Sequence, residues 1–267
     1  MFTIATVNVN GIRAAYRKGM GEWLEATNPS VLLMQEVRAT DEIVADLLGS
    51  EWTFVHQACD IKGRAGVAIA TKSSFEAVRI GLGNGEPEVP VDTGRWVEAD
   101  LTLPGGDQIT VVSTYIHSGT AGTEKMAQKY AHLDKVTARL GELMESDRHV
   151  VVAGDINIAH TNNDIKNWKG NLKTAGFLPE ERAYLDRWFG AGWTDLGRKM
   201  AGEVAGPYTW WSNRGQAFDN DSGWRIDYQL ATPALAEIAS NARVDRAPSY
   251  DTRWSDHAPL LVDYELN

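Results

Sequence analysis

The middle of the chain reads His149-Val150-Val151-Val152-Ala153-Gly154-Asp155-Ile156-Asn157. The first five residues are mostly apolar and β-branched, which favours a buried strand, and the last four carry a carboxylate and an amide. Active sites of α/β proteins tend to lie where strands end and in the loops that follow. This stretch therefore predicts an α/β fold with a polar site at one edge of a sheet.

The same pairing of an apolar run with polar residues recurs at four other places. Asn8-Val9-Asn10-Gly11 follows Phe2–Val7, Gln35-Glu36 follows Val31–Met34, Asp227 follows Trp224–Ile226, and Ser255-Asp256-His257 precedes Ala258–Val262. For any single residue, a turn cap or a buried hydrogen bond is the commoner role. If all these ends converge, one site holds the polar side chains of Asn8, Asn10, Glu36, Asp155, Asn157, Asp227, Asp256 and His257.

Apolar periodicity predicts further strands and two helices. The expected strands are Phe2–Asn8, Val31–Glu36, Trp52–His56, Gly66–Thr71, Arg95–Leu101, Gln108–Tyr115, His149–Ala153, Trp224–Ala231 and Ala258–Tyr264. The expected helices are Ile12–Thr27 and Thr123–Glu145, the second with apolar residues at steps of three and four. No repeat or long linker divides the sequence. We therefore expect one domain over residues 1–267, with a pair of mixed sheets covered by outer helices.

The charge balance argues against a nucleic-acid partner unless basic residues cluster. Lys and Arg number 26 and Asp and Glu number 36, which gives a net charge of −10. Three stretches, 12–18, 61–72 and 165–175, carry Lys and Arg without any acid. They are either solvated loops, which charge alone favours, or local contacts for phosphate.

The cysteine content points to a reducing compartment. Cys59 is the single cysteine, which excludes an intrachain disulfide and a thiolate zinc site. The first residues lack the basic and apolar regions of a signal peptide, and no apolar run has the length of a membrane span. We therefore expect a cytoplasmic protein that does not use a membrane.

The residue types at the strand ends suit phosphoester hydrolysis. Mg²⁺ prefers oxygen ligands and needs only one or two carboxylates, a role that fits Glu36 with Asp256 or Asn10. Asp155 could deprotonate or orient a water, and the amides of Asn8 and Asn157 could hold phosphate oxygens without adding negative charge. An imidazole fixed by a carboxylate, His257 with Asp227, could donate a hydrogen bond to the phosphoryl oxygen.

These residues resemble a known family. The chain is similar to the exodeoxyribonuclease III and AP endonuclease family, of the bacterial exodeoxyribonuclease III type, in motifs that span residues 8 to 259. The motifs are Asn8-Val9-Asn10-Gly11-Ile12-Arg13-Ala14, Leu33-Met34-Gln35-Glu36, Gly154-Asp155-Ile156-Asn157, Trp224-Arg225-Ile226-Asp227-Tyr228 and Ser255-Asp256-His257-Ala258-Pro259. Two further stretches, Asp164–Phe177 and Tyr208-Thr209-Trp210-Trp211, resemble the DNA-repair branch.

The resemblance implies a four-layered α/β sandwich and a magnesium-dependent nuclease, with Mn²⁺ as a possible substitute. Glu36 would bind the metal with Asp256 and Asn10 nearby, and Asp155 and Asn157 would activate and orient water next to it. Asn8 and Tyr115 would contact the phosphate, and Asp227 would pair with His257. The residues expected to contact DNA are Arg13, Ala14, Lys62, Arg64, Asn167 and Asn171, and those expected to line a pocket for a flipped-out abasic sugar are Trp210, Trp224 and Ile226.

The implied activity is incision of duplex DNA 5′ to abasic sites, with removal of 3′ nucleotides or 3′ blocking groups. The implied protein is a cytoplasmic, nucleoid-associated monomer. Three departures from the family pattern bear on the metal count and on the balance of activities: Asn10 stands where some members have Asp, Arg38 where many have Lys, and Tyr115-Ile116-His117-Ser118-Gly119 differs from better-known relatives.

Three alternatives stay open. The chain could be a 3′-5′ exonuclease with little abasic-site activity. It could be another phosphodiesterase of the same superfamily, such as a secreted nuclease or a phosphoinositide phosphatase, which the absent signal peptide and the 164–177 segment disfavour. It could also be a catalytically silent DNA-binding module, which the presence of Glu36, Asp155 and His257 disfavours.

Overall fold

The first and last strands of the chain lie side by side in one sheet. In the computed structural model, which describes residues 2–83, 87–146 and 148–265, β1 (Phe2–Asn8) pairs antiparallel with β12 (Leu260–Tyr264) and parallel with β2 (Val31–Gln35). The sheet continues with β4 (Val67–Thr71) and β3 (Thr53–Gln57) on one side and β11 (Ala239–Val244) on the other. Its strand order is β11-β12-β1-β2-β4-β3.

A second sheet of six strands repeats this plan around its own parallel pair. β7 (Gln108–Tyr115) runs parallel to β8 (His149–Asp155), and all other neighbours are antiparallel. The strand order is β5-β6-β7-β8-β10-β9. The remaining strands of this sheet are β5 (Ala77–Ile80), β6 (Trp96–Thr102), β9 (Thr194–Asp195) and β10 (Asp227–Ala231).

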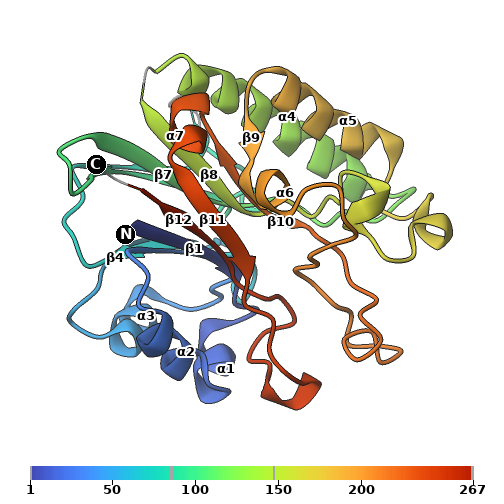
Figure 1. Ribbon diagram of the computed structural model, residues 1–267, viewed down its shortest axis with the longest axis horizontal. Coiled ribbons are helices and arrows are strands. Elements are labelled where there is room, and N and C mark those ends of the chain that lie inside the picture. The colour runs from blue at the N-terminus through green and yellow to red at the C-terminus, as the bar shows by residue number, and fades with distance from the viewer. Residues whose placement is uncertain (1, 84–86, 147, 266–267) are drawn as a thin grey trace.

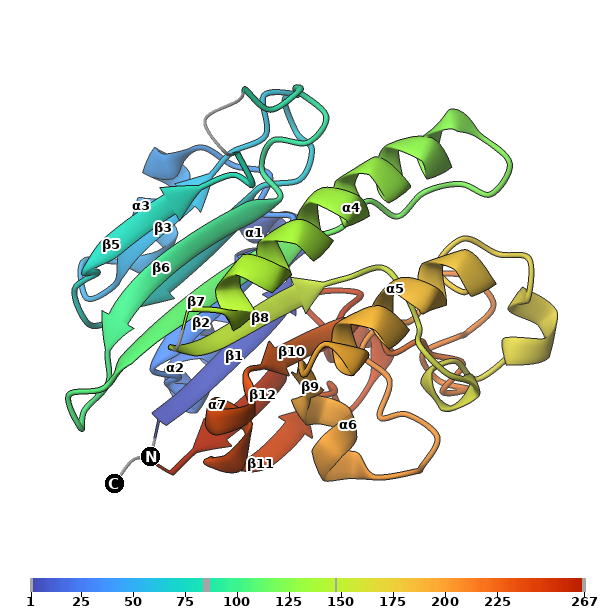
Figure 2. The same cartoon turned by 90° about the horizontal axis from the view of Figure 1, so that it is seen from above.

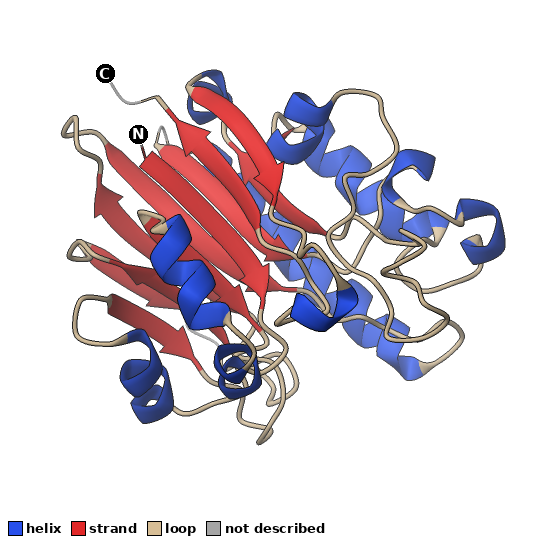
Figure 3. Ribbon diagram, turned by 60° about the horizontal axis from the view of Figure 1, so that its bottom comes forward, coloured by secondary structure: helices blue, strands red, loops and turns tan. Residues whose placement is uncertain are grey.

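The sheets pack face to face between two outer layers of helices (Figures 1, 2 and 3). The first sheet is covered by α1 (Ile12–Arg17), α2 (Met20–Thr27) and α3 (Asp41–Leu48). The second is covered by α4 (Glu124–Met144) and α5 (Pro179–Gly190). Helix α6 (Leu196–Ala201) packs against β10 and β11, and α7 (Pro233–Glu237) packs against β8 and β11. Short 3-10 turns span Asn162–Asp164, Trp168–Asn171 and Tyr250–Thr252. The expected four-layered sandwich of two mixed sheets is therefore confirmed.

Side-chain alternation explains why the central strands are apolar throughout. In β8, Val151 and Ala153 belong to the core between the sheets, whereas Val150 and Val152 pack in the cluster under α4 and α5. A strand buried on both faces reads as a continuous apolar run, so its first polar residue marks the edge of the sheet. Along α4, the expected apolar stripe is buried at Met126, Leu133, Val136, Leu140 and Leu143.

Two sequence expectations about elements are wrong. Ile12–Thr27 is not one helix, because Gly19 adopts a left-handed backbone with φ of 110° and separates α1 from α2. The expected strand Trp224–Ala231 is regular only from Asp227, and Trp224 forms only isolated bridges with Ile165 and Trp210. Within the described ranges, none of the helices combines the length and the apolar character needed to cross a bilayer.

Candidate active site

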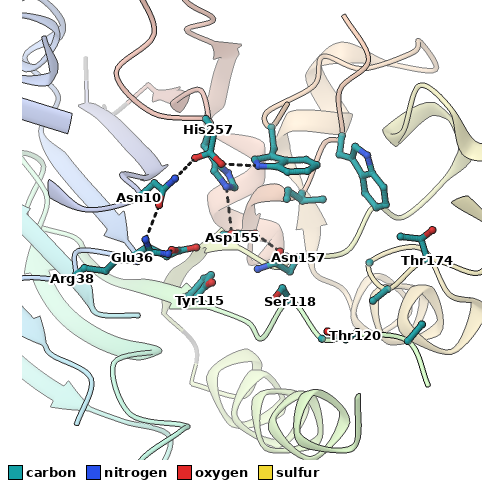
Figure 4. A pocket seen from close by; sticks show the side chains of 18 of the residues that line it. Asn10, Glu36, Arg38, Tyr115, Ser118, Thr120, Asp155, Asn157, Thr174 and His257 are labelled. Atoms are coloured by element: carbon teal, nitrogen blue, oxygen red, sulfur yellow. Dashed lines mark hydrogen bonds and ion pairs between the residues drawn. The ribbon is translucent and has the colours of Figure 1, made fainter. Parts of the chain in front are cut away.

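The polar ends of the central strands meet at one edge of the sandwich. Register pairs Tyr115 at the end of β7 with Asp155 at the end of β8, and pairs Asp155 with Asp227 at the start of β10. Asn8 ends β1 opposite Gln35. A cavity of about 750 Å³ opens at this edge (Figure 4) and is lined by Asn10, Glu36, Arg38, Tyr115, Ser118, Gly119, Thr120, Ala121, Asp155, Asn157, Lys173, Thr174, Ala175, Gly176, Trp210, Trp224, Ile226, Asp256 and His257.

An imidazole lies between two buried carboxylates at the base of this cavity. His257 Nδ1 is 2.8 Å from Asp227 Oδ2, and its Nε2 is 3.8 Å from Asp155 Oδ2. The hydroxyl of Thr209 accepts the backbone N–H of Asp227 and so fixes the start of β10. The pair that the sequence predicted between Asp227 and His257 is therefore formed.

Asn8 holds two of the carboxylates together. Its side-chain amide donates to Glu36 Oε1 at 3.0 Å and to Asp155 Oδ2 at 2.9 Å, and the side chain has no solvent exposure. Its amide oxygen accepts the backbone N–H of Asn10. Both amide protons are thus used inside the protein. In this arrangement Asn8 spaces the two acids, and its expected contact with a phosphate stays a prediction.

Side-chain oxygens of Glu36 and Asn10 accept hydrogen bonds from the positively charged Arg38. The Arg38 guanidinium donates to Glu36 Oε2 and, at 2.9 Å, to Asn10 Oδ1. The amide of Asn10 donates in turn to Asp256 Oδ1 at 2.8 Å, and Trp210 Nε1 donates to Asp256 Oδ2 at 3.1 Å. This oxygen-rich set already accommodates positive charge, so it fits a hard divalent cation. A second group of possible ligand atoms, from Asp155, Asp227 and His257, lies within 4.8 Å of one another.

Left-handed backbone conformations aim these side chains into the cavity. Asn10, Glu36, Arg38 and Asn157 have φ of 47°, 49°, 50° and 54°. Such angles are uncommon for residues with a Cβ and persist where the surrounding structure enforces them. Each of these residues stands just beyond a strand, and the turn redirects its side chain toward the site. The strand expected to include Glu36 ends at Gln35 for this reason.

Burial and neighbouring charges shift the pKa values of two groups in this site, the Asp155 carboxyl and the His257 imidazole. Burial raises the pKa of the Asp155 carboxyl to about 7; Asp227 and Glu36 act in the same direction, whereas His257 and Asn8 oppose it. Burial alone would lower the pKa of His257, but the charges of Asp227 and Asp155 outweigh it and raise that pKa to about 10. Near neutral pH the site therefore pairs a carboxyl close to its pKa with a charged imidazole.

Asn157 and Tyr115 stand on either side of Asp155. The backbone N–H of Asn157 donates to Asp155 Oδ1 at 2.9 Å, and its side-chain amide donates to the carbonyl of Ile116 at 2.9 Å. The guanidinium carbon of Arg95 lies 4.9 Å from the centre of the Tyr115 ring. Burial, with the charges of Glu36 and Asp155, raises the pKa of Tyr115 well above its usual value, so the phenol stays a proton donor.

Two tryptophans form one wall of the cavity. The rings of Trp210 and Trp224 are 6.1 Å apart at 80°, and Ile226 completes the apolar surface. Strict alternation would place Trp224 and Ile226 on the face opposite Asp227, but this segment precedes the regular strand. Trp224 and Ile226 line the cavity, and Asp227 acts on it through His257. A Cβ on Gly176, which has φ of +92°, would lie 3.2 Å from the Trp224 ring, so only glycine allows the 173–176 segment to close on it comfortably.

The expected DNA contacts surround this cavity. Arg13 lines an adjoining groove with Arg17, and this groove shares Asn10 and Arg38 with the cavity. Lys62 and Arg64 are exposed on a loop whose Ala65 carbonyl accepts the backbone N–H of Arg38.

Asn167 and Asn171 are placed on the Trp224 side of the cavity. Their segment is joined to the Trp224 segment by the hydrogen bond from Lys166 N to Gly223 O. Both side chains also make local turn contacts: Asn167 accepts from Gly170 N, and Asn171 donates to Asn167 O.

Several residues of the site were not predicted. Ser118, Thr120 and Thr174 line the cavity, and no strand end marks them in the sequence. Lys129 and Glu181 form a buried ion pair behind the cavity. The sequence did carry a signal for Lys129, because it falls between Met126 and Leu133 on the apolar stripe of its helix, where a lysine is out of place.

Comparison with known proteins agrees with this geometry. Residues 5–257 match the endonuclease/exonuclease/phosphatase family. The chain is 30% identical over 254 residues to an exodeoxyribonuclease of Bacillus subtilis, covering 95% of each chain, and 31% identical to a DNA-(apurinic or apyrimidinic site) endonuclease of Dictyostelium discoideum, covering 99% of this chain and 71% of that relative. An AP endonuclease structure from Archaeoglobus fulgidus is similar over 100% of both chains, with a TM-score of 0.86 and 29% identity. A 3′-5′ exonuclease structure from Neisseria meningitidis is similar over 99% of this chain and 100% of that chain, with a TM-score of 0.85 and 27% identity.

Proposed function

Because this chain belongs to the endonuclease/exonuclease/phosphatase family, we propose that it is a DNA-repair nuclease that hydrolyses the phosphodiester bond 5′ to an abasic site. The strongest support for this proposal is the composition of the cavity. Asp155, His257 and Glu36 converge beside an apolar wall of Trp210 and Trp224. The chemistry of phosphate hydrolysis and a surface that selects for a missing base thus share one cavity.

The oxygens of Glu36, Asn10 and Asp256 would hold a divalent cation, which we propose to be Mg²⁺ with Mn²⁺ as a substitute. When bound, such an ion neutralises charge on the phosphate and polarises it. A second ligand set could form around Asp155, whose carboxylate lies within 4.8 Å of ligand atoms of Asp227 and His257, with Asn157 close to it in the chain. Asn10, rather than a carboxylate, limits the negative charge at this end of the cavity.

Four side chains would carry out the proton transfer, the orientation of water and the stabilisation of charge on the phosphate. Asp155 would take a proton from the attacking water, because its pKa of about 7 suits a base near neutral pH. Asn157, tied to Asp155 through its backbone, would orient that water. His257, kept charged by Asp227, and Tyr115, kept neutral by burial, would donate hydrogen bonds to phosphate oxygens as negative charge develops.

The aromatic wall would recognise damage. An abasic sugar leaves the helix at lower cost than a normal nucleotide, because no base must be unstacked. Trp210, Trp224 and Ile226 offer it a rigid apolar surface, and rigid aromatic rings hold a shape at little entropic cost. The proposed role of this surface is to accept the bare sugar and to disfavour a nucleotide that still bears its base.

Local basic loops would bind the duplex despite the net charge of −10. Arg13 lines a groove next to the cavity, and Lys62 and Arg64 belong to a loop that is hydrogen-bonded to Arg38. Asn167 and Asn171 belong to the segment that is hydrogen-bonded beside Trp224. We propose that one domain acts as a monomer on duplex DNA with abasic or damaged 3′ ends, in the cytoplasm at the nucleoid. The single Cys59 fits a reducing compartment, and the likeness to the Bacillus subtilis exodeoxyribonuclease supports a DNA substrate.

A second candidate is removal of nucleotides or blocking groups from 3′ ends. The likeness to the Neisseria 3′-5′ exonuclease favours it. A duplex with one internal abasic analogue and a labelled strand separates the two activities. A single product cut at the analogue supports the proposed endonuclease, and a ladder that starts at the 3′ end supports the exonuclease.

A further inference from the structure

A buried ion pair joins the two helices behind the cavity. Lys129 Nζ of α4 lies 2.5 Å from Glu181 Oε1 of α5, and both side chains are fully buried. Neither residue lines the cavity. A buried charge pair often stabilises a fold no more than apolar residues of the same size would. The pair therefore calls for an explanation other than stability.

The lysine ammonium uses its remaining protons on the backbone of two segments that line the cavity. It donates to the carbonyl of Asn157 at 2.9 Å and to the carbonyl of Ser118 at 3.3 Å. With Glu181 as the third acceptor, all three donors of the ammonium are satisfied. One side chain thus holds the turn that carries Asn157 and the loop that follows Tyr115.

The glutamate reaches a third segment on the opposite wall. Glu181 Oε2 accepts the backbone N–H of Gly176 at 2.6 Å and that of Leu178 at 3.0 Å. Gly176 is the residue that approaches Trp224, and its carbonyl accepts the backbone N–H of Ala159. The ion pair therefore connects the water-orienting side of the cavity to its aromatic side.

The loops leave little room for another arrangement. A Cβ on Gly119 would lie 2.5 Å from Met126 Sδ and 3.2 Å from Lys129 Cδ, so this loop rests directly on the lysine stem. A Cβ on Gly176 would lie 3.1 Å from the carbonyl oxygen of Asn157. Gly119 thus packs against the Lys129 stem, and Gly176 packs against the carbonyl that accepts from Lys129.

We propose that Lys129 and Glu181 are positioning residues, which set the place of Asn157 and the width of the cavity between its 118–121 and 173–176 walls. The inference rests on the proposed nuclease function, and it adds a buried pair that acts through the backbone rather than on the substrate. An error of about 1 Å in such placement can lower a rate by about 100-fold, so the pair can control turnover without touching DNA.

The test separates positioning from stability with a neutral replacement. Lys129→Met alone leaves the Glu181 charge buried without a partner, so both the melting temperature and the activity should fall. The double variant Lys129→Met with Glu181→Gln removes both charges and keeps an acceptor for Gly176. Its melting temperature should recover toward that of the wild type. Its kcat on an abasic duplex should remain lower by about 10-fold or more, with KM within about threefold of the wild type, because placement rather than binding is lost.

A matched control comes from the same helix. Arg139→Gln removes another ion pair of α4, between Arg139 Nε and Glu98 Oε1 at 2.7 Å, on the part of the helix away from the cavity. This variant should keep the wild-type kcat. In ¹⁵N spectra, the backbone signals of Asn157 and Gly176 should move in the double variant and stay in place in the Arg139 variant.

A stable double variant with wild-type kcat and unmoved Asn157 and Gly176 signals would overturn the proposal. If the double variant does not fold, Lys129→Met and Glu181→Gln are each measured at a temperature at which both are folded, and wild-type kcat with unmoved Asn157 and Gly176 signals in both would overturn the proposal. A wild-type protein that cuts no abasic duplex would contradict the proposed function instead. The spectral comparison would still decide whether the pair positions Asn157.

Discussion

His257 Nδ1 lies 2.8 Å from Oδ2 of Asp227; both side chains are buried, and His257 lines the cavity. The second oxygen of that carboxylate has no hydrogen-bond partner among the described residues. The negative charge of Asp227 is therefore directed mainly at one imidazole. The ionisation of His257 depends on this contact, and so does the pH range in which the site can donate to a phosphate.

Replacing Asp227 with Asn should lower the pKa of His257. The folded protein raises that pKa to about 10, so the charged imidazole is present below this value and is lost as pH rises through it. Without the carboxylate, the upper limb of the pH–rate profile should move to lower pH, and kcat at neutral pH should fall by about 10-fold or more. NMR titration of His257 measures the shift. Asp186→Asn, which removes the partner of His160 at the surface, is the control, and an unchanged His257 titration would exclude the proposed coupling.

Replacing Asn8 with Ala should shift the lower limb of the pH–rate profile. Asn8 donates to the Asp155 carboxylate and so stabilises its charged form, although burial still raises the pKa of Asp155 to about 7. Losing this donor should raise the pKa further. If Asp155 is the base, the lower limb of the pH–rate profile should move to higher pH. A lower limb that stays where it is in the wild type would mean that Asp155 does not titrate in the rate-limiting step.

Binding to duplex DNA should weaken as salt concentration rises. The slope of log affinity against log salt is about −0.9 per phosphate neutralised. Arg64→Ala should reduce the magnitude of this slope by about one unit, if that side chain neutralises one phosphate. Fluorescence anisotropy of a labelled duplex in EDTA gives the slope. Arg148→Ala, at the other end of β8, is the control and should leave it unchanged. A salt-independent affinity would show that the basic loops are only solvated.

Replacing Trp224 with Ala should relax damage recognition. The preference for abasic over intact duplex should fall by about 10-fold, more than the general phosphodiesterase activity falls. Rates on the two duplexes, measured side by side, give the ratio. Trp23→Ala, a tryptophan of α2 outside the cavity lining, should leave the ratio unchanged. If cleavage of both duplexes falls equally, or if the variant is unfolded, Trp224 has a structural role and does not recognise damage.

The strand ends could be predicted from sequence because burial on both faces leaves a clear boundary. Val150 to Ala153 face two apolar layers, so the first carboxylate after them, Asp155, had to lie at the sheet edge. Glu36 could be predicted in the same way, because it follows the apolar run Val31–Met34. The two-sheet architecture followed from the number and spacing of such runs.

Contacts between distant segments could not be predicted in this way. The amide of Asn8 is used by Glu36 and Asp155, which are 28 and 147 residues away in sequence. The ion pair of Lys129 with Glu181 spans 52 residues. The irregular backbone at Trp224 likewise depends on its bridges to Ile165 and Trp210, which are distant in sequence, whereas the break at Gly19 has a local cause in the glycine itself. Periodicity along the chain carries no information about such partners.

The most direct test of a metal-dependent nuclease site at Glu36 measures incision at an abasic analogue. The wild type and Glu36→Gln are compared, each with Mg²⁺ or with EDTA. Glu36 is the carboxylate that Asn8 and Arg38 hold at the proposed metal site. We expect the wild type to cut once, 5′ to the analogue, with Mg²⁺ only, and we expect Glu36→Gln to stay folded and to lose activity by about 100-fold or more. Equal incision by the wild type in EDTA and in Mg²⁺, or by Glu36→Gln and the wild type, would contradict a metal-dependent nuclease built on this site.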